Sequence, residues 1–378
     1  MAYDSPTLSR NQIKVLPTIL TWKNATINVD IIMSSVQKAY ARAGVDVDLG
    51  NRVKATIQQK VAKTMRPEVL GKIGGFGGLF RANFKGMKDP VLVSSVDGVG
   101  TKLKLAFALK KHDTVGQDLV NHCVNDIAVL GAEPLYFLDY IGTGKLEPKV
   151  FNELLSGLAT ACAQSGCALL GGETAQMPGI YQVGEYDLVG CIVGIVDKPK
   201  IVDGKKIKKG DVVIGVESSG LHTNGYSLAR RILFDDLQMA MSDKIPGHKQ
   251  SVGQMLLNVH INYLPLVRLM MKKGVIIKGM AHITGGGLMD NLPRVLPKSV
   301  DAVIDSKSWP VPPLFQFLCE RGKLNFEESY QVFNMGIGYT FVVSPSEVNK
   351  ALGIAKTLKM RAHVIGQIAK GSGIVKVQ

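Results

Sequence analysis

One segment constrains what this chain can fold into more than any other: GQDLVNHCVNDIAVLGAEP at residues 116–134. At about 100° per residue, its polar side chains share one face of a helix, and apolar residues take the opposite face. The polar residues are Asp118, Asn121, His122, Asn125 and Asp126. A solvated face is one interpretation, but such faces usually carry better helix formers than Asn, Asp and His. Carboxylates and carboxamides can instead hold a hard cation such as Mg²⁺ together with nucleotide phosphates.

A second segment, residues 91–107, supports the same interpretation. The buried strand predicted at 91–96 is followed by Asp97, and ligands of α/β folds bind at this end of strands. Two glycines then permit a tight turn, and Thr101 and Lys102 offer a hydroxyl group and a cation to phosphate oxygens. Because the spacing is not that of a P-loop, the motif predicts phosphate binding of another kind.

A glycine-rich stretch lies upstream, with Gly74, Gly75, Gly77 and Gly78 around Phe76. A backbone without side chains can approach a nucleotide closely, although a flexible connection is the alternative interpretation. Its occurrence together with Asp97 and the polar helix face favours a nucleotide site.

Six motifs follow one another along the chain. They are DGVGTK at 97–102, Asp-x4-Gly-Ala-x-Pro from Asp126 to Pro134, GGETAQMPG at 171–179, SSGLHTNGYSLAR at 218–230, HITGGGLMDNLPR at 282–294 and FNMGIGY at 333–339. Together they resemble the phosphoribosylformylglycinamidine cyclo-ligases, also called aminoimidazole ribonucleotide synthetases, and the likeness begins near Ala43. It implies purine biosynthesis, in which ATP, formylglycinamidine ribonucleotide and Mg²⁺ yield aminoimidazole ribonucleotide, ADP and phosphate.

The resemblance also implies the fold: two α+β domains with mixed sheets, and a homodimer formed mainly through the N-terminal domains. Alternating strands and helices by themselves would also allow an α/β fold with a doubly wound parallel sheet. We expect four parts: an N-terminal extension at 1–34, an ATP-binding and dimerisation domain at 35–197, a linker at 198–208 and a C-terminal domain at 209–378.

Hydrophobic periodicity predicts the individual elements. Strands are expected at 91–96, 135–142, 186–196, 212–217, 302–305, 338–343 and 363–368. Helices are expected at 49–64, 115–130, 148–165, 226–240, 252–272, 287–296 and 346–359.

Two loops of the C-terminal half precede predicted helices and suit anions such as the ribose phosphate. One carries His222 and Asn224, and the other carries Gly285 and Gly286 beside His282. We predict catalytic roles for Lys102, His222, Asn224 and Glu173, with Asp118, His122, Glu173 and His222 as alternatives for a proton shuttle. Cofactor contacts are predicted for Gly74, Gly75, Gly77, Asp97, Thr101, Asp118, Asn125, Gly131, Gly285 and Gly286, and metal ligation for Asp97 and Asp126.

Composition excludes several other classes. No apolar run approaches the roughly 20 residues needed to cross a bilayer, so no membrane segment is expected. The five cysteines are odd in number and lie mostly in apolar contexts, which predicts free thiols and a cytoplasmic enzyme. A formal charge of +14 would suit nucleic acid, but the basic residues are dispersed, so we expect no such partner. Another ATP-using member of the superfamily and an inactive paralogue remain as alternatives.

One segment departs from the family pattern. After Leu256 and Leu257, members commonly carry a Pro-Thr pair before an aromatic residue, whereas this chain has NVHINY at 258–263. A substrate contact at this segment is therefore not carried over: either His260 substitutes for it or the loop is repacked.

Overall fold

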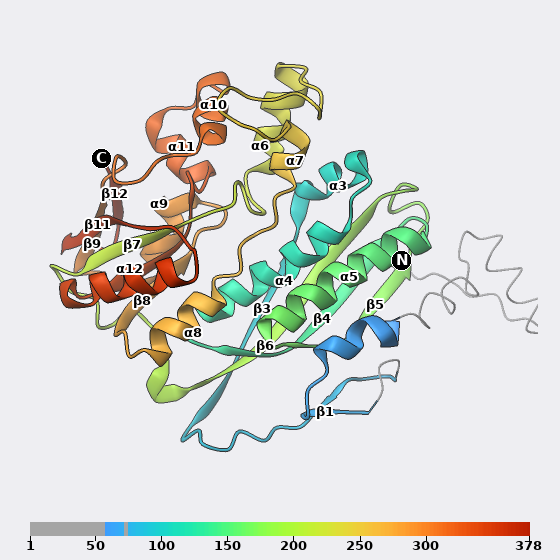
Figure 1. Ribbon diagram of the computed structural model, residues 1–378, viewed down its shortest axis with the longest axis horizontal. Helices are drawn as coiled ribbons and strands as arrows, with labels where there is room; N and C mark the ends of the chain where they lie inside the picture. The colour runs from blue at the N-terminus through green and yellow to red at the C-terminus, as the bar shows by residue number, and fades with distance from the viewer. Residues whose placement is uncertain (1–56, 72–74) are drawn as a thin grey trace, which may run out of the picture.

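The computed structural model describes residues 57–71 and 75–378 (Figure 1). The predicted extension at 1–34, the first part of the predicted helix at 49–64 and Gly74 lie outside the described residues. No helix in the described part of the chain combines the length and the apolar character that a membrane span requires.

The N-terminal half is built on a four-stranded sheet with the strand order β3-β6-β4-β5. β4 and β5 run parallel, whereas β6 is antiparallel to both β3 and β4, so the sheet is mixed. A short ribbon of β1 and β2 precedes it. The elements are the 3-10 turn η1 (Ala62–Thr64), β1 (Val69–Leu70), β2 (Leu79–Phe80), β3 (Pro90–Gly98), η2 (Gly100–Lys102), α3 (Leu103–Leu109), α4 (Asp113–Ala128), β4 (Glu133–Thr143), α5 (Pro148–Ser165), β5 (Ala168–Gln176) and β6 (Tyr186–Asp197).

Helices α4 and α5 lie side by side over one face of this sheet (Figure 1). Glycines allow their backbones to approach: a Cβ atom at Gly157 would lie 2.1 Å from the carbonyl oxygen of Asp113, and one at Gly116 would lie 2.5 Å from that of Leu154. α5 begins with Pro148 in its first turn, where proline costs no hydrogen bond, and ends at Gly166, which is left-handed with φ 67°.

The other face of the sheet carries apolar side chains in contact with solvent. Along β3 exposed and half-buried residues alternate, and Leu92 and Val96 are 61% and 64% exposed. Such an apolar face in a single chain is typical of an association surface.

The C-terminal half contains a six-stranded sheet with the order β12-β9-β11-β7-β10-β8. All pairs are antiparallel except β12 with β9. Its elements, with the 3-10 turn η3 (Lys198–Lys200) before them, are β7 (Val212–Glu217), α6 (Tyr226–Arg230), the π-helical turn η4 (Arg231–Asp236), α7 (Val252–Leu256), α8 (Leu264–Lys272), β8 (Ile277–His282), α9 (Gly287–Asn291), η5 (Leu292–Val295), β9 (Val300–Ile304), α10 (Pro313–Arg321), α11 (Phe326–Val332), β10 (Ile337–Val343), η6 (Pro345–Glu347), α12 (Val348–Thr357), β11 (Ala362–Lys370) and β12 (Val375–Val377).

The mixed sheets confirm the α+β expectation and rule out a doubly wound parallel sheet. The sequence did not predict strands β1, β2, β5, β8 and β12 or helices α3, α10 and α11. β5 reads ALLGGETAQ, and its glycines and polar residues hide the apolar alternation that marks a strand.

The predicted helix at 252–272 is wrong as one element. α7 ends at Leu256 and α8 begins at Leu264, and residues 257–263 between them are not helical. The predicted helices at 226–240 and 287–296 are shorter as α-helices and continue as a π-helical turn and a 3-10 turn. Pro293 accounts for the second of these changes, since it has no backbone donor for an α-helical bond.

Candidate active site

The candidate site lies where the two halves meet. The polar face of α4 points toward the C-terminal half, and the carboxyl end of β3 lies beside it. From the C-terminal half come three segments: the loop after β7, the loop at 257–263 and the end of β8.

Two charged residues of the N-terminal half are buried against the 257–263 loop. Lys102 Nζ lies 2.7 Å from Asp118 Oδ2 and donates a hydrogen bond to the carbonyl oxygen of Asn258 at 2.7 Å. Asp118 Oδ1 accepts the backbone N–H of His260 at 2.7 Å. Burial lowers the pKa of Lys102 and raises that of Asp118, and the attraction between the two charges opposes both changes.

Two asparagines of α4 bind the same loop. Asn121 donates through Nδ2 to the carbonyl oxygen of His260 at 2.8 Å. Asn125 donates to the carbonyl oxygen of Ile261 at 2.8 Å and accepts the N–H of Tyr263 at 2.9 Å. Because these side chains satisfy backbone groups of the loop, the loop does not need helical hydrogen bonds of its own. We call Lys102, Asp118, Asn121 and Asn125 the interdomain clasp.

Three of the predicted site residues belong to the interdomain clasp and contact the 257–263 loop. Lys102, Asp118 and Asn125 are all 0% exposed, and each binds a backbone group of the other half. Their predicted contacts with substrate or nucleotide stay predictions, whereas their contacts with the loop are a structural role that the sequence did not indicate.

Further along the same helix face, acids and histidines form a second group. His122 Nε2 lies 2.7 Å from Asp97 Oδ2 and 3.8 Å from Asp126 Oδ2. His282 Nδ1 lies 2.8 Å from Asp126 Oδ1, and the Ser95 hydroxyl donates to Asp126 Oδ2 at 3.0 Å. We call Asp97, His122, Asp126 and His282 the carboxylate–histidine cluster. The carboxylates form its mouth, since Asp97 and Asp126 keep 42% and 28% of their side chains exposed.

The contacts within the cluster stabilise the charged forms of Asp97, Asp126 and His122. Burial is the largest single effect and raises the pKa of both Asp97 and Asp126, but hydrogen bonds and charge attraction from His122 and His282, with smaller hydrogen bonds from neighbouring groups, together leave both pKa values lowered. Burial lowers the pKa of His122, but its hydrogen bond to Asp97 and the nearby carboxylate charges outweigh that effect and raise it. The pKa of His282 stays lowered, because burial there exceeds the effect of Asp126.

A second layer lies behind the cluster. His122 Nδ1 contacts Thr223 Oγ1 at 2.6 Å, and His282 Nε2 contacts His260 Nε2 at 2.9 Å. The ring of His222 stacks on that of His260, with centroids 4.0 Å apart. His222 adopts the left-handed φ of 61°, and its Nε2 accepts the N–H of Ser219 at 3.1 Å. Burial holds the pKa of both His222 and His260 well below the usual range.

Other predicted residues border the cluster without joining it. The Thr101 hydroxyl lies 3.0 Å from that of Ser227, and Asn224 Nδ2 donates to Thr223 Oγ1 at 3.3 Å. Asn224 also lies close to Gly285, and Gly286 turns the chain into α9 with φ 92°. The two loops of the C-terminal half are therefore adjacent.

Four predicted residues lie elsewhere. Glu173 is on β5, which is separated from β3 by two strands, and its carboxylate accepts the N–H of Thr174 at 2.8 Å. Gly75 and Gly77 are exposed in the β1–β2 connection, whose Gly78 approaches Leu170 at the start of β5. Gly131 turns the chain after α4 beside Val202. The structure does not bring these residues to the cluster.

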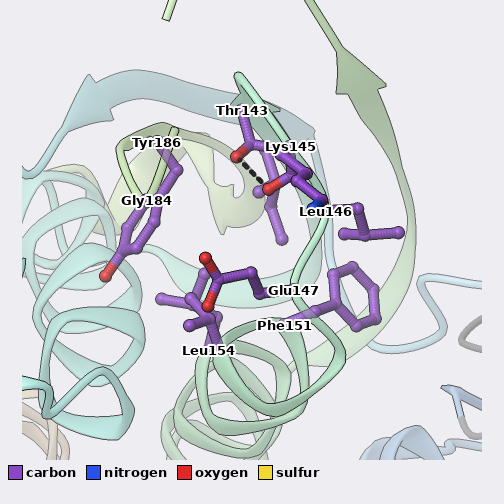
Figure 2. Close-up of a pocket in the computed structure, with 10 residues that line it drawn as sticks. Thr143, Lys145, Leu146, Glu147, Phe151, Leu154, Gly184 and Tyr186 are labelled. Atoms are coloured by element: carbon purple, nitrogen blue, oxygen red, sulfur yellow. Dashed lines mark hydrogen bonds between the residues drawn. The ribbon is translucent and has the colours of Figure 1, made fainter. Parts of the chain in front are cut away.

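A hollow in the N-terminal half is a different feature. It lies between the start of α5 and the start of β6, and mostly apolar side chains line it, including Phe151, Leu154 and Tyr186 (Figure 2). Its volume of about 20 Å³ suffices for one or two water molecules and not for a nucleotide. We therefore place the candidate site at the junction of the two halves.

The sequence did not indicate Thr223 or Ser95, it named His282 only as a neighbour of a loop, and it named His260 only as a possible substitute for a family contact. One signal was available: His222 and His282 lie in motifs, His122 lies just before the motif that begins at Asp126, and His260 lies in the segment that departs from the family pattern. Only the tertiary structure shows that these four histidines lie close together.

The two mixed-sheet halves, with acids and histidines at their junction, define a class of proteins. Comparison with known proteins identifies this class. The N-terminal domain model of the AIR synthase related proteins matches residues 82–196, and the C-terminal domain model matches residues 208–378.

Sequence relatives narrow the class. A phosphoribosylformylglycinamidine cyclo-ligase of Syntrophotalea carbinolica is 52% identical over 341 residues, which are 90% of this chain and 97% of that protein. One from Geobacillus kaustophilus is 49% identical over 337 residues, 89% of this chain and 97% of that protein. The chain belongs to the phosphoribosylformylglycinamidine cyclo-ligase family.

Solved structures share the fold at low identity. The hydrogenase maturation protein HypE of E. coli has a TM-score of 0.64 at 17% identity, covering 87% of this chain and 93% of that one. Thiamine-monophosphate kinase of Stenotrophomonas maltophilia has a TM-score of 0.62 at 18% identity, covering 86% and 96%. These similarities concern the fold alone.

Proposed function

We infer that this chain catalyses the cyclisation of formylglycinamidine ribonucleotide to aminoimidazole ribonucleotide, in de novo purine biosynthesis, with ATP converted to ADP and phosphate. The observation that carries this inference is the identity of about half of all residues over 88–90% of the chain with cyclo-ligases from several organisms. The six motifs recognised in the sequence lie within the matched length.

The reaction explains why a nucleotide is needed. A formyl amide carbonyl is a poor electrophile, and its oxygen is a poor leaving group. ATP transfers its terminal phosphoryl group to this oxygen and gives an iminophosphate. The amidine nitrogen that bears the ribose then attacks the activated carbon and loses its proton, a C–N bond forms, and the C–O bond breaks with release of phosphate. Phosphoryl transfer needs mainly positioning and neutralisation of charge, and ring closure needs proximity and proton transfer.

We propose that ATP binds at the carboxylate–histidine cluster. A hydrogenase maturation protein HypE of the same fold has been solved in complex with ATP, at a TM-score of 0.62 and 15% identity, which supports nucleotide binding by such a fold. The partly exposed carboxylates of Asp97 and Asp126 are suitable ligands for a Mg²⁺ ion that accompanies the nucleotide. Such an ion would neutralise charge on the phosphoryl group during transfer.

For the remaining predicted residues the contacts favour different roles. We propose that Lys102 acts as a positioning residue, because its contacts fix the 257–263 loop and with it His260. Thr101, which contacts Ser227, and Asn224, which contacts Thr223 next to His122, are candidates for phosphate contacts. His222 touches His260 and is proposed to orient that ring.

We propose that the chain forms a homodimer through the exposed face of the four-stranded sheet, where Leu92 and Val96 lie. A Val96→Glu substitution places a charge on this face and should convert the dimer to a monomer in light scattering, whereas Ile276→Glu, at an exposed apolar residue of the C-terminal half, should not. The cytoplasm is the proposed compartment, because all five cysteines are free thiols.

The decisive experiment mixes the purified chain with formylglycinamidine ribonucleotide, ATP and Mg²⁺, and follows aminoimidazole formation and ADP release together. We expect one ADP per aminoimidazole. ADP release without aminoimidazole would contradict the proposed reaction and indicate another ATP-using activity of the same fold.

A further inference from the structure

The side chain of His260 joins two loops of the C-terminal half. Its Nε2 lies 2.9 Å from His282 Nε2 at the end of β8, and its Nδ1 lies 3.4 Å from Thr223 Oγ1 in the loop after β7. Its ring also stacks on that of His222, with centroids 4.0 Å apart. Because His260 is 1% exposed, each of its ring nitrogens needs a partner inside the protein.

The neighbours of this ring decide which of its nitrogens carries the hydrogen. Asp126 is an acceptor because its pKa is lowered, so His282 Nδ1, which lies 2.8 Å away, carries a hydrogen. Burial lowers the pKa of His282, so its ring is neutral near pH 7 and its Nε2 has only a lone pair. His260 therefore donates through Nε2 to His282 and accepts at Nδ1 from the Thr223 hydroxyl.

The remaining contacts agree with this assignment. His122 Nδ1 donates to Thr223 Oγ1 at 2.6 Å, because the raised pKa of His122 keeps both of its nitrogens protonated. The Asn125 amide, whose Nδ2 lies 3.3 Å from His260 Nε2, donates to the carbonyl oxygen of Ile261 at 2.8 Å. The chain of hydrogen bonds thus begins on α4, passes through both loops and returns to α4.

The backbone of His260 is held separately from its side chain. Its N–H donates to Asp118 Oδ1 at 2.7 Å, and its carbonyl oxygen accepts from Asn121 Nδ2 at 2.8 Å. The interdomain clasp therefore fixes the loop whatever side chain stands at this position. Neither residue of the family's Pro-Thr pair has a ring with two nitrogen atoms that could connect both loops in this way.

We propose that His260 is a positioning residue of the cyclisation site: its Nε2–H holds the imidazole of His282 in the orientation that presents Nδ1–H to Asp126. His222 and Thr223 fix the plane of the His260 ring, and His260 transmits that orientation to the end of β8. The inference rests on the proposed function, since Asp126 is a carboxylate of the proposed ATP site. His260 is buried and acts only through His282.

The test compares two amides at position 260. In His260→Gln the amide group reaches the place of Nε2 and can donate to His282, whereas in His260→Asn it reaches only the place of Nδ1. We expect His260→Gln to keep the kcat of cyclisation within about threefold. His260→Asn should lower kcat by about tenfold or more and change the KM for ATP by less than about twofold, because misplacement of the ring acts on the transition state. Equal kcat values in the two variants would overturn the proposal.

His112 provides a matched control, because it is 6% exposed and its Nδ1 lies 2.8 Å from Tyr186 Oη within the N-terminal half. His112→Gln and His112→Asn should have equal kcat values. A difference between them as large as that between the His260 variants would overturn the proposal. Urea unfolding gives the folded fraction of each variant, and a His260→Asn variant that loses kcat only in proportion to its folded fraction would overturn it as well.

A second measurement does not depend on cyclisation. Nitrogen resonance spectra of the histidine-labelled full chain should show His282 with a hydrogen on Nδ1 and none on Nε2, and His260 with the reverse. His260→Gln should keep the His282 pattern, and His260→Asn should lose it. A hydrogen on His282 Nε2 in the unmodified chain would overturn the proposal. An inactive chain with the expected pattern would contradict the proposed function and keep the orientation of His282 by His260.

Discussion

The interdomain clasp and the carboxylate–histidine cluster occupy the same face of α4 and use their polar groups in different ways. Asp118 in the clasp is 0% exposed and binds a lysine and a backbone N–H, whereas Asp126, about two turns later, keeps 28% of its side chain exposed and binds two histidines and a serine. Both residues are aspartates, but the 257–263 loop covers Asp118 and leaves Asp126 partly exposed to solvent. A loop closes over one end of the helix face and leaves the other open to a ligand.

The largest expected effect breaks the clasp. Lys102→Met would leave Asp118 buried without its partner, which should lower the free energy of unfolding by about 3–5 kcal/mol. Lys104→Met removes a solvent-exposed ion pair with Glu185 and should cost less than about 1 kcal/mol. Urea unfolding of both variants measures the difference. Equal losses would mean that the buried pair is no more important to the fold than the exposed one.

The next effect concerns the cluster and should appear in turnover. If ATP binds at the proposed site, Asp97→Asn and Asp126→Asn each remove a charge that would lie near the transferred phosphoryl group, and each should lower turnover by about 100-fold or more. Because both side chains are partly exposed, unfolding curves should change little. Asp203→Asn, on the exposed segment between the halves, serves as the control. Turnover near that of the unmodified chain in either cluster variant would remove its carboxylate from the proposed site.

The smallest effect concerns the layer behind the cluster and depends on pH. Burial lowers the pKa of His222 in the folded chain, so the unfolded chain binds the extra proton. Stability from this residue is therefore present above pH 6.5 and is lost as the pH falls below it, with a slope of up to about 1.4 kcal/mol per pH unit.

His222→Asn should flatten this slope between pH 6.5 and 5.5, since asparagine tolerates the left-handed backbone at this position. The unmodified chain, measured in parallel, is the reference for this slope. Unfolding free energies measured across this range decide the matter, and an unchanged slope in His222→Asn would show that His222 takes up its proton without unfolding.

Much of the fold followed from local pattern. The helix predicted at 148–165 and the strand predicted at 212–217 have the predicted bounds, because their apolar spacing is strong and Pro148 and Gly166 mark the helix ends. The polar face of α4 was also predicted. The interruption at 257–263 was not, because it depends on hydrogen bonds from a helix more than 130 residues earlier in the chain.

Residue types and short spacings were enough to predict the family, the chemistry of its motifs and the faces of its regular elements. They did not show that Asp118 and Asn125 hold a loop while Asp97 and Asp126 contact two histidines. Periodicity places a side chain on a face of its own helix, but its partner comes from a distant segment that packs there. His260 and His282 reached α4 in this way, and no local spacing records that contact.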